Sequence, residues 1–323
     1  MRFFSLLIIF SLIVVPLSFS QSQEFITSLY SDYLKGLFYI EKGEYKLGLE
    51  SLERAKAKDP KSVHIRLKIA TVLMRLDKPD EAEKVLKEAK KLDPNYLDIS
   101  LVLIFLYAYT QNDAELEREY EAFLQKAHEL KPKSTDISEY LAQFYFYKKK
   151  PQEAIKIYEA ILQTNPNYVD ALFWLGYLYD QTGKRKEAID IWKKGLKISP
   201  EYAPILNSLG YYYAQEGVNL SEAETMVKKA LEKEPENGAY LDSLGWIYFK
   251  KGDLKKAEES LTKAIALIKD PEIYEHLGDL YIKLDNKDKA ILYYQEGLTN
   301  FPDYTSLQKK VKQYGEEVPL PKN

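Results

Sequence analysis

The chain has no cysteine and very few histidines, and these two shortages exclude most site chemistry. Among 323 residues there are 0 Cys and 3 His. Without thiols there is no disulfide, no cysteine-ligated zinc, no thiol nucleophile and no cysteine for a lipid anchor. The histidines, His64, His128 and His276, lie far apart in the sequence. An enzyme needs a nucleophile or base held near an orienting partner, so we expect no catalytic site and no cofactor.

An excess of positive charge is also missing. Lys and Arg number 46 against 49 Asp and Glu, which gives a net charge of −3. Proteins that bind the phosphate backbone carry a basic patch or stripe. We therefore expect no nucleic-acid partner.

Only one stretch is strongly apolar, and it lies at the N-terminus. Arg2 precedes an apolar run from Phe3 to Leu17, and Ser18-Phe19-Ser20 has the small-x-small pattern of a cleavage site. Residues 1–20 are therefore predicted to be a secretory signal peptide, followed by a linker over 21–28. The alternative is an uncleaved membrane anchor, because a run of this length is near the minimum for a spanning helix. We expect a periplasmic or secreted protein with no stable membrane insertion after cleavage.

A short pattern repeats along the rest of the chain. Leu-Gly-x-x-Tyr recurs at steps of 33 to 35 residues, and an alanine follows each tyrosine by nine or ten residues. Such a constant period is the signature of stacked structural repeats. The four copies begin at Leu175, Leu209, Leu244 and Leu277.

Each repeat is predicted to form two helices. In residues 169–202, Leu172, Leu175, Gly176 and Tyr179 fall at i, i+3, i+4 and i+7, which is one face of a helix. The sequence Thr-Gly-Lys then interrupts the pattern, and the same spacing resumes from Ala188. Small residues on facing stripes allow two helices to approach closely. No single pair buries enough surface, so we expect the pairs to be stabilised by stacking.

Prolines near the ends of the pairs define the remaining units, since proline ends one helix and suits the first turn of the next. The third unit is the longest, with its extra residues expected around Gln111 to Glu119. A short amphipathic helix over 305–314 is expected to cap the array, and 315–323 to form a disordered tail. The eight predicted units are 29–62, 63–96, 97–134, 135–168, 169–202, 203–237, 238–270 and 271–304.

This pattern resembles the tetratricopeptide repeat (TPR) family over residues 29–304, and the block from Asn207 to Tyr281 looks like bacterial envelope members. The resemblance implies an all-α, right-handed superhelical solenoid of about eight helix–turn–helix units. It also implies that the first helix of each unit lines a concave groove where ligands bind. An asparagine at the position of Asn207 can bond a peptide backbone in some such superhelices.

The residues three before and one after the small residue of each first helix are predicted to face this groove. Tyr179 and its counterparts lie on the buried stripe, whereas Tyr177, Tyr211 and Trp246 lie about 100° further round the helix. Exposed aromatic residues there would serve as anchors for a partner. The predicted partner-binding residues are Phe105, Gln143, Phe173, Tyr177, Asn207, Tyr211, Asp242, Trp246, Glu275 and Asp279.

Acidic residues are expected on the same side as these aromatics, and lysine pairs on the second helices. An acidic and aromatic groove would prefer a neutral or basic peptide. The expected acids are Asp136, Glu139, Asp170, Asp180, Asp242, Glu272, Glu275 and Asp279.

One acidic group was weighed as a metal site. Glu272, Glu275, His276 and Asp279 lie within one helical stretch. Carboxylates at a helix start are also favoured by the helix dipole, and isolated carboxylates rarely complete a coordination shell. We therefore expect no metal.

The sequence thus predicts a non-catalytic scaffold that binds a partner protein or an extended peptide, in envelope or secretion-machine assembly. Two alternatives remain open. The groove aromatics could stack on sugar rings in a carbohydrate-binding or export accessory protein, and exposed end repeats could drive self-assembly. The sequence does not identify the partner, the pathway or the oligomeric state.

Overall fold

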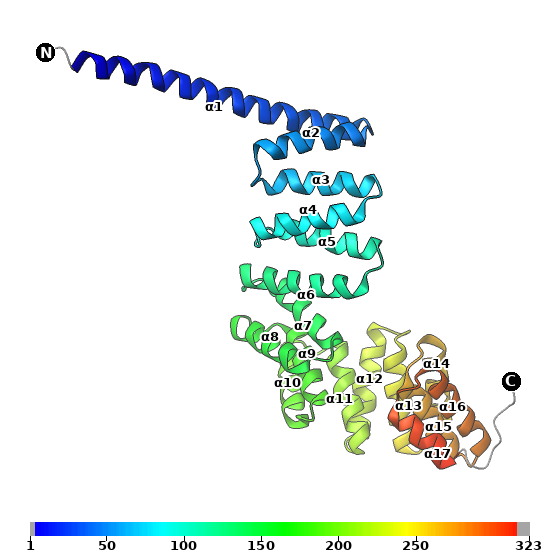
Figure 1. Cartoon of the computed structure of the whole chain (residues 1–323). Helices are drawn as coiled ribbons and strands as arrows, with labels where there is room; N and C mark the ends of the chain where they lie inside the picture. Colours follow the sequence, from blue (N-terminus) through cyan, green and yellow to red (C-terminus); the bar gives the residue numbers. More distant parts are fainter. Residues whose placement is uncertain (1–3, 315–323) are drawn as a thin grey trace. The chain divides into compact units, whose positions relative to one another are not determined.

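The computed structural model describes the backbone of residues 4–314 and the side chains of residues 23–314. Over this range every regular element is a helix (Figure 1). The predicted tail over 315–323 lies outside the described residues. The helices are α1 (Phe4–Glu41), α2 (Tyr45–Lys58), α3 (Val63–Arg75), α4 (Pro79–Leu92), α5 (Leu97–Tyr109), α6 (Asp113–Leu130), α7 (Thr135–Tyr147), α8 (Pro151–Thr164), α9 (Val169–Gln181), α10 (Arg185–Ile198), α11 (Ala203–Glu216), α12 (Leu220–Lys233), α13 (Gly238–Lys251), α14 (Leu254–Leu267), α15 (Pro271–Lys283), α16 (Lys287–Asn300) and α17 (Thr305–Tyr314).

The helices form consecutive antiparallel pairs, and the chain is an all-α solenoid. From the second unit on, each predicted range contains one pair, and its first helix starts at the first residue of that range. The extra residues of the third unit lengthen α6 to 18 residues, where most second helices have 14. A helix, α17, occupies the range 305–314.

The linker expected over residues 21–28 is helical instead. It belongs to α1, which continues without a break to Glu41. Polar residues such as Gln21 and Ser22 do not stop a helix that is already formed, because no proline or glycine interrupts the stretch. The continuity of α1 does not test cleavage after Ser20.

Contacts divide the chain into two compact units, with the division inside α7. Unit 1 comprises residues 1–144, and unit 2 comprises residues 145–323. The core of unit 1 is built from α2 to α5, around Leu52, Ile69, Leu86 and Leu103. Most of the core of unit 2 lies between α11 and α17. Each unit is described separately below.

The two helices of each pair are joined by a tight turn with a residue in the left-handed region. Glycine takes this position in several pairs, for example Gly183 (φ +79°) and Gly252 (φ +84°), and it does so without strain. The next residue then donates its backbone N–H back to the end of the first helix. Lys184 N donates to Tyr179 O at 2.8 Å, and Asp253 N donates to Tyr248 O at 2.9 Å.

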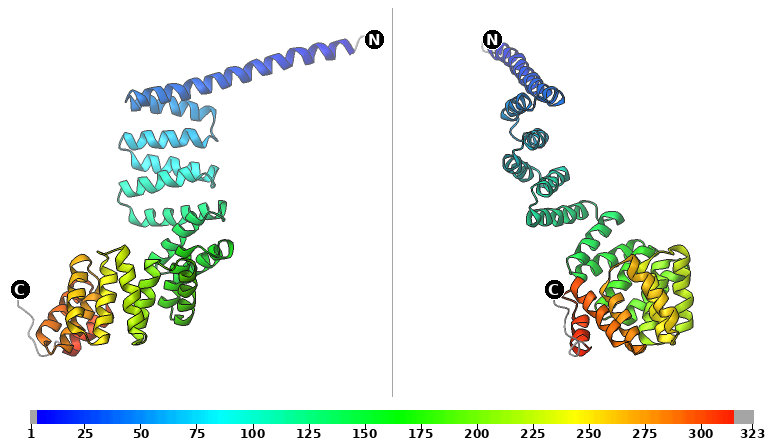
Figure 2. Two further views of the ribbon diagram at one scale, coloured as in Figure 1. Left: turned by 180° about the vertical axis from the view of Figure 1, so that it is seen from behind. Right: turned by 90° about the vertical axis from the view of Figure 1, so that its right-hand side faces the viewer.

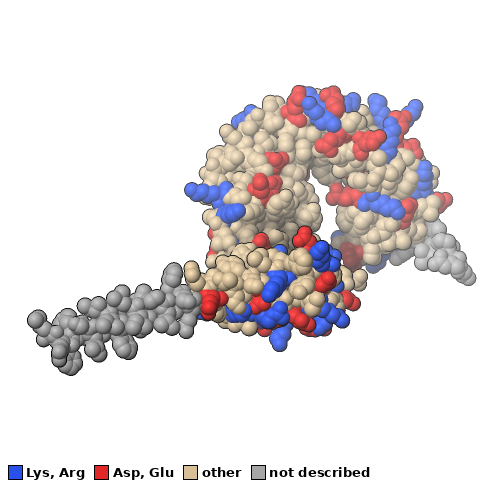
Figure 3. Space-filling model, turned by 90° about the horizontal axis from the view of Figure 1, so that it is seen from above, with Lys and Arg blue, Asp and Glu red and all other residues tan. Residues whose placement is uncertain are grey.

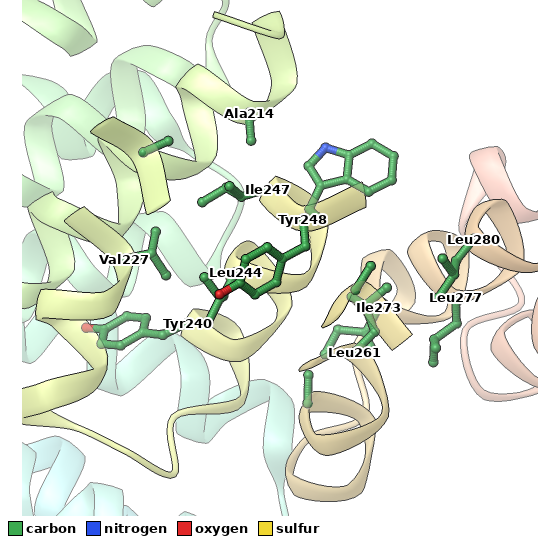
Figure 4. Close-up of a cluster of buried hydrophobic side chains, with 14 of the residues drawn as sticks. Ala214, Val227, Tyr240, Leu244, Ile247, Tyr248, Leu261, Ile273, Leu277 and Leu280 are labelled. Carbon is green, nitrogen blue, oxygen red and sulfur yellow. The ribbon is translucent and has the colours of Figure 1, made fainter. Parts of the chain in front are cut away.

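Small residues on the first helix let a large side chain from the second helix fill the interface. Trp192 lies against Gly176, and a Cβ there would be 2.3 Å from the indole nitrogen. The indole N–H donates to the backbone oxygen of Phe173 at 3.2 Å. Leu261 lies against Gly245 in the same way. Figure 4 shows α13 inside this core, with Leu244, Ile247 and Tyr248 among side chains from the neighbouring helices.

The pairs of unit 2 follow a curved path (Figure 2). The curvature brings α11 and α15 together, although α13 lies between them in the sequence. Tyr211 on α11 donates a hydrogen bond from its hydroxyl to Glu272 Oε2 on α15 at 3.1 Å. The first helices of unit 2 therefore face a common inner side.

The start of α13 depends on an asparagine cap, which gives a first prediction. Asn237 Oδ1 accepts from the backbone N–H groups of Ala239 and Tyr240, at 3.0 and 3.2 Å. We expect Asn237→Ala to lower the free energy of unfolding by about 1 kcal/mol. Asn237→Asp keeps the acceptor and should lose much less. Urea denaturation followed by circular dichroism measures both, and equal losses would contradict the capping role.

The side chains described, those of residues 23–314, include no helix that is long and apolar enough to cross a membrane.

Candidate functional site: the inner groove of unit 2

A groove with a volume of about 450 Å³ lies on the inner side of unit 2. It is formed mainly by the first helices α9, α11, α13 and α15, together with the turn before α15. We refer to it as the inner groove, and the residues that carry its chemistry are Tyr177, Asp180, Asn207, Tyr211, Asp242, Asp270 and Glu272.

Four of the ten predicted partner-binding residues line the inner groove. These are Tyr177, Asn207, Tyr211 and Asp242. Phe173 lies beside them and packs its ring 6.4 Å from that of Tyr177. The structure therefore brings together the central part of the predicted set.

The two upstream residues lie in unit 1. Phe105 on α5 is 69% exposed, and Gln143 on α7 is half-buried. Neither one lines the inner groove.

Trp246 differs from the expectation of an exposed aromatic residue, because only 7% of it is exposed. Its indole is stacked between two rings, with centroid distances of 4.0 Å to His276 and 4.7 Å to Phe249. Lys250 lies over the ring at 5.0 Å. A buried indole cannot serve as a docking platform without a rearrangement of these neighbours.

The next repeat explains this difference. His276 lies two positions before Gly278, and it covers Trp246 of the preceding unit. At the corresponding positions of the earlier units stand Ser208 and Ser243, opposite Tyr177 and Tyr211 in the same register. Serine is too small to cover a tyrosine ring. Tyr177 and Tyr211 thus remain accessible from the groove.

Glu275 and Asp279 are held by the terminal helix and do not line the inner groove. Ser306 donates to Glu275 Oε1 at 2.7 Å. Lys310 and the Tyr294 hydroxyl both donate to Asp279 Oδ1 at 2.5 Å. The two carboxylates therefore fix α17 onto α15.

A buried ion pair forms part of the groove wall. His276 Nδ1 on α15 lies 2.9 Å from Asp242 Oδ1 on α13, and both side chains are buried. Burial lowers the pKa of His276, but the nearby Asp242, Glu272 and Glu275 more than offset it, so the pKa is raised overall. The imidazole is therefore protonated over a wider pH range than in the unfolded chain.

Tyr211 lies in the middle of the inner groove. Its hydroxyl accepts from Gln215 Nε2 at 2.5 Å and donates to Glu272. Burial, with the nearby carboxylates of Glu272 and Asp242, raises its pKa. The hydroxyl stays protonated at any physiological pH and acts as a fixed polar group.

The inner groove carries more acids than bases. Burial raises the pKa of Asp180, Asp270 and Glu272, since the groove solvates their charges incompletely. Among the described residues that line it, Arg185 is the one cationic side chain, and it pairs with Glu216 at 2.9 Å. On the face shown in Figure 3, by contrast, acidic and basic side chains are intermixed over the outside of the helices.

The sequence reasoning missed Asp270 and Gln215. Asp270 precedes Pro271 and caps α15, with Oδ1 accepting from the backbone N–H of Glu272 at 2.8 Å. The Asp-Pro-Glu order is a helix-start signal that could have revealed it. Nothing in the sequence marks Gln215.

Among the side chains of residues 23–314, no group of His, Asp and Glu is arranged to hold a metal ion. The acidic stretch weighed as a metal site is divided between three sets of partners: His276 pairs with Asp242, Glu272 with Tyr211, and Glu275 and Asp279 with α17.

These features define a class of protein: an all-α solenoid of helical hairpins with a ligand-sized groove along its first helices. Models of the tetratricopeptide repeat match residues 39–108, 146–209, 239–271 and 271–304. The chain belongs to the tetratricopeptide repeat family.

Solved structures support the fold. The Cut9–Hcn1 hetero-tetramer of the APC/C is 16% identical, with a TM-score of 0.57, over 87% of this chain and 54% of that chain. A thermophilic TPR protein of Thermus thermophilus is 24% identical (TM-score 0.49, 56% of this chain and 98% of that one). A TPR protein of Parabacteroides merdae is 18% identical (TM-score 0.47, 88% and 98%). No curated protein sequence matches the chain.

Proposed function

We propose that the chain is a non-catalytic scaffold that binds an extended segment of a partner protein in the inner groove. TPR proteins generally mediate protein–protein interactions. The observation that carries the proposal is the pair Tyr177 and Tyr211, which face a groove of about 450 Å³ and are not covered by the next repeat. Amphipathic aromatic side chains are the usual anchors of such interfaces.

The charge of the groove favours a neutral or basic segment. Asp180, Asp270 and Glu272 have no cationic side chain hydrogen-bonded to them, and their pKa values are raised. A lysine or arginine of the partner would supply the missing counter-charge. Such binding weakens as salt screens the attraction.

Synthetic peptides test the proposal. We expect basic and neutral 15-residue peptides on an array to bind the purified chain, and their acidic counterparts not to bind. Tyr177→Ala with Tyr211→Ala should reduce binding at least tenfold, while circular dichroism shows that the helices are retained. A control with Tyr140→Ala and Tyr147→Ala removes two exposed tyrosines of α7 and should bind as before. Equal binding by both double variants would place the site elsewhere.

Carbohydrate binding is the competing function, since Tyr177 and Tyr211 could also stack on sugar rings. The burial of Trp246 removes one of the three platforms on which this alternative depended. A glycan array run beside the peptide array separates the two. Retention of soluble glycans, with no peptide bound, would replace the peptide proposal.

We place this scaffold in the bacterial envelope, where it would take part in assembly of an envelope or secretion machine. The apolar run before Ser20 supports this proposal. Intact mass of the chain, recovered from the periplasm of a bacterium that expresses the full sequence, tests it. We expect a protein that lacks residues 1–20. An unprocessed chain in the membrane fraction would instead indicate an anchor.

A further inference from the structure

An apolar stripe lies on the free side of α1. Ile26, Tyr30, Leu34 and Phe38 follow one another at i, i+4 intervals and are 48%, 60%, 59% and 56% exposed. That spacing places them along one side of the helix. We refer to these four residues as the α1 stripe.

The opposite side of α1 is fully engaged. Gly36 lies against Leu52 of α2, and Asp32 pairs with Arg54 at 3.2 Å and with Lys58 at 2.6 Å. Figure 1 shows α2 along this side of α1, with no helix of the described part of unit 1 on the other side. The α1 stripe is therefore an outer surface of unit 1.

The two ends of the solenoid are built differently. At the C-terminal end, α17 buries Leu307 against the last pair and turns Gln308, Lys309 and Lys312 to solvent. Repeat arrays need such a polar outer face on their terminal element for solubility. The first helix presents four large apolar side chains where the last one presents polar groups.

We propose that the α1 stripe binds the same stripe of a second copy of this chain. The two α1 helices lie antiparallel, related by a twofold axis level with Asp32. A twofold interface requires a self-complementary surface. Around Asp32 the stripe meets this requirement, because Tyr30 faces Leu34 of the second copy and Ile26 faces its Phe38.

Charge favours the antiparallel arrangement. Gln23 and Glu41 lie on the same side of the helix as the stripe, at its two ends, and both are exposed. An antiparallel pair places the Gln23 amide beside the Glu41 carboxylate of the second copy. A parallel pair places Glu41 beside Glu41, and like charges repel. Antiparallel helix dipoles add to the same preference.

A bilayer is a poorer occupant of this surface. Helices that lie on membranes carry Lys and Arg on the polar face, which attract anionic lipids. Between Gln23 and Glu41, α1 has the acids Glu24, Asp32 and Glu41 and a single base, Lys35.

The size of the stripe indicates a reversible dimer. Large side chains that are about half exposed each lose on the order of 100 Å² when covered, so the pair buries on the order of 1,000 Å² in total. This lies at the low end of specific interfaces. We therefore expect dissociation in the micromolar range.

Sedimentation velocity of the protein produced from the full-length sequence, with its N-terminus identified by intact mass, tests the proposal. Between 1 and 100 µM we expect a shift from monomer to dimer. Tyr30→Lys with Leu34→Lys should weaken the dimer at least tenfold. Leu292→Lys is the matched control, since Leu292 is 62% exposed on α16, and it should dimerise as before. A chain that stays monomeric at 100 µM overturns the proposal, as does a dimer that survives the double substitution.

Engineered cysteines test the arrangement, and the absence of native cysteine keeps the background clean. A mixture of Tyr30→Cys and Leu34→Cys chains should form a mixed disulfide faster than either chain cross-links to itself. Ile26→Cys mixed with Leu34→Cys should cross-link slowly, because these positions are out of register. Preferential self-linking of Leu34→Cys would contradict the antiparallel pair. Co-flotation with anionic vesicles, lost in the double lysine variant of a monomeric chain, would assign the stripe to a membrane instead.

Discussion

Asp242→Ala is expected to lower the free energy of unfolding of unit 2 by about 3–5 kcal/mol, the usual cost of removing one partner of a buried ion pair. The substitution leaves His276 buried without its counter-charge and opens the contact between α13 and α15. Urea denaturation followed by circular dichroism measures the loss. His276→Ala should cost a similar amount, since it leaves Asp242 unpaired and uncovers Trp246.

The double variant is the control for this prediction. With both partners removed, neither charge stays buried alone, so the loss should be clearly smaller than the sum of the two single losses. Strictly additive losses would show that the pair contributes no coupling.

The pair also makes the stability of unit 2 depend on pH. Because the pKa of His276 is raised above its ordinary value of 6.5, the folded chain holds the proton more tightly than the unfolded chain. The stabilisation is complete below about pH 6.5 and is lost as the pH rises through the folded pKa. The stability difference between the native chain and His276→Gln should therefore shrink from pH 6 to pH 9. A difference that grows over this range would contradict the sign.

Gly278→Ala is the second large effect, with an expected loss of about 2 kcal/mol of unfolding free energy. A Cβ at Gly278 would lie 2.0 Å from Cε1 of Tyr294. That ring is fully buried, and its hydroxyl is held by Asp279, so it cannot move aside. Overpacking of this kind costs about 1–3 kcal/mol or more, against a gain of about 1 kcal/mol in helix propensity.

Gly48→Ala is the matched control, because Gly48 is also a buried glycine inside a helix. A Cβ there would lie 3.0 Å from Ile40 Cγ1, and the half-buried Ile40 can shift by a few tenths of an ångström. We expect a change within about 0.5 kcal/mol. Similar losses for the two variants would argue against a steric role for Gly278.

The helix pairs could be predicted because their information is local. The spacing of Leu175, Gly176 and Tyr179 requires a helix with one buried stripe, and the glycine in the turn then ends it. The accessibility of the groove residues is decided between repeats. Trp246 is buried by His276 of the next unit, while Ser208 and Ser243 leave Tyr177 and Tyr211 accessible.

Curvature is the other property that the sequence conceals. Tyr211 and Glu272 are 61 residues apart and meet only because the path of unit 2 curves. The roles of Glu275 and Asp279 depend in the same way on where α17 packs. A rule based on position within one repeat cannot supply these contacts, because each is a sum of small rotations from pair to pair.

Titration calorimetry with the basic peptide that binds best on the array tests the central claim most directly. The chain would be compared with two variants of equal charge: Asp180→Asn with Glu272→Gln in the inner groove, and Glu187→Gln with Glu232→Gln on the second helices. We expect the groove variant to bind at least tenfold more weakly and to lose most of its salt dependence, while the second variant binds as the native chain does. Equal weakening in both variants, or in neither, would contradict a binding site in the inner groove.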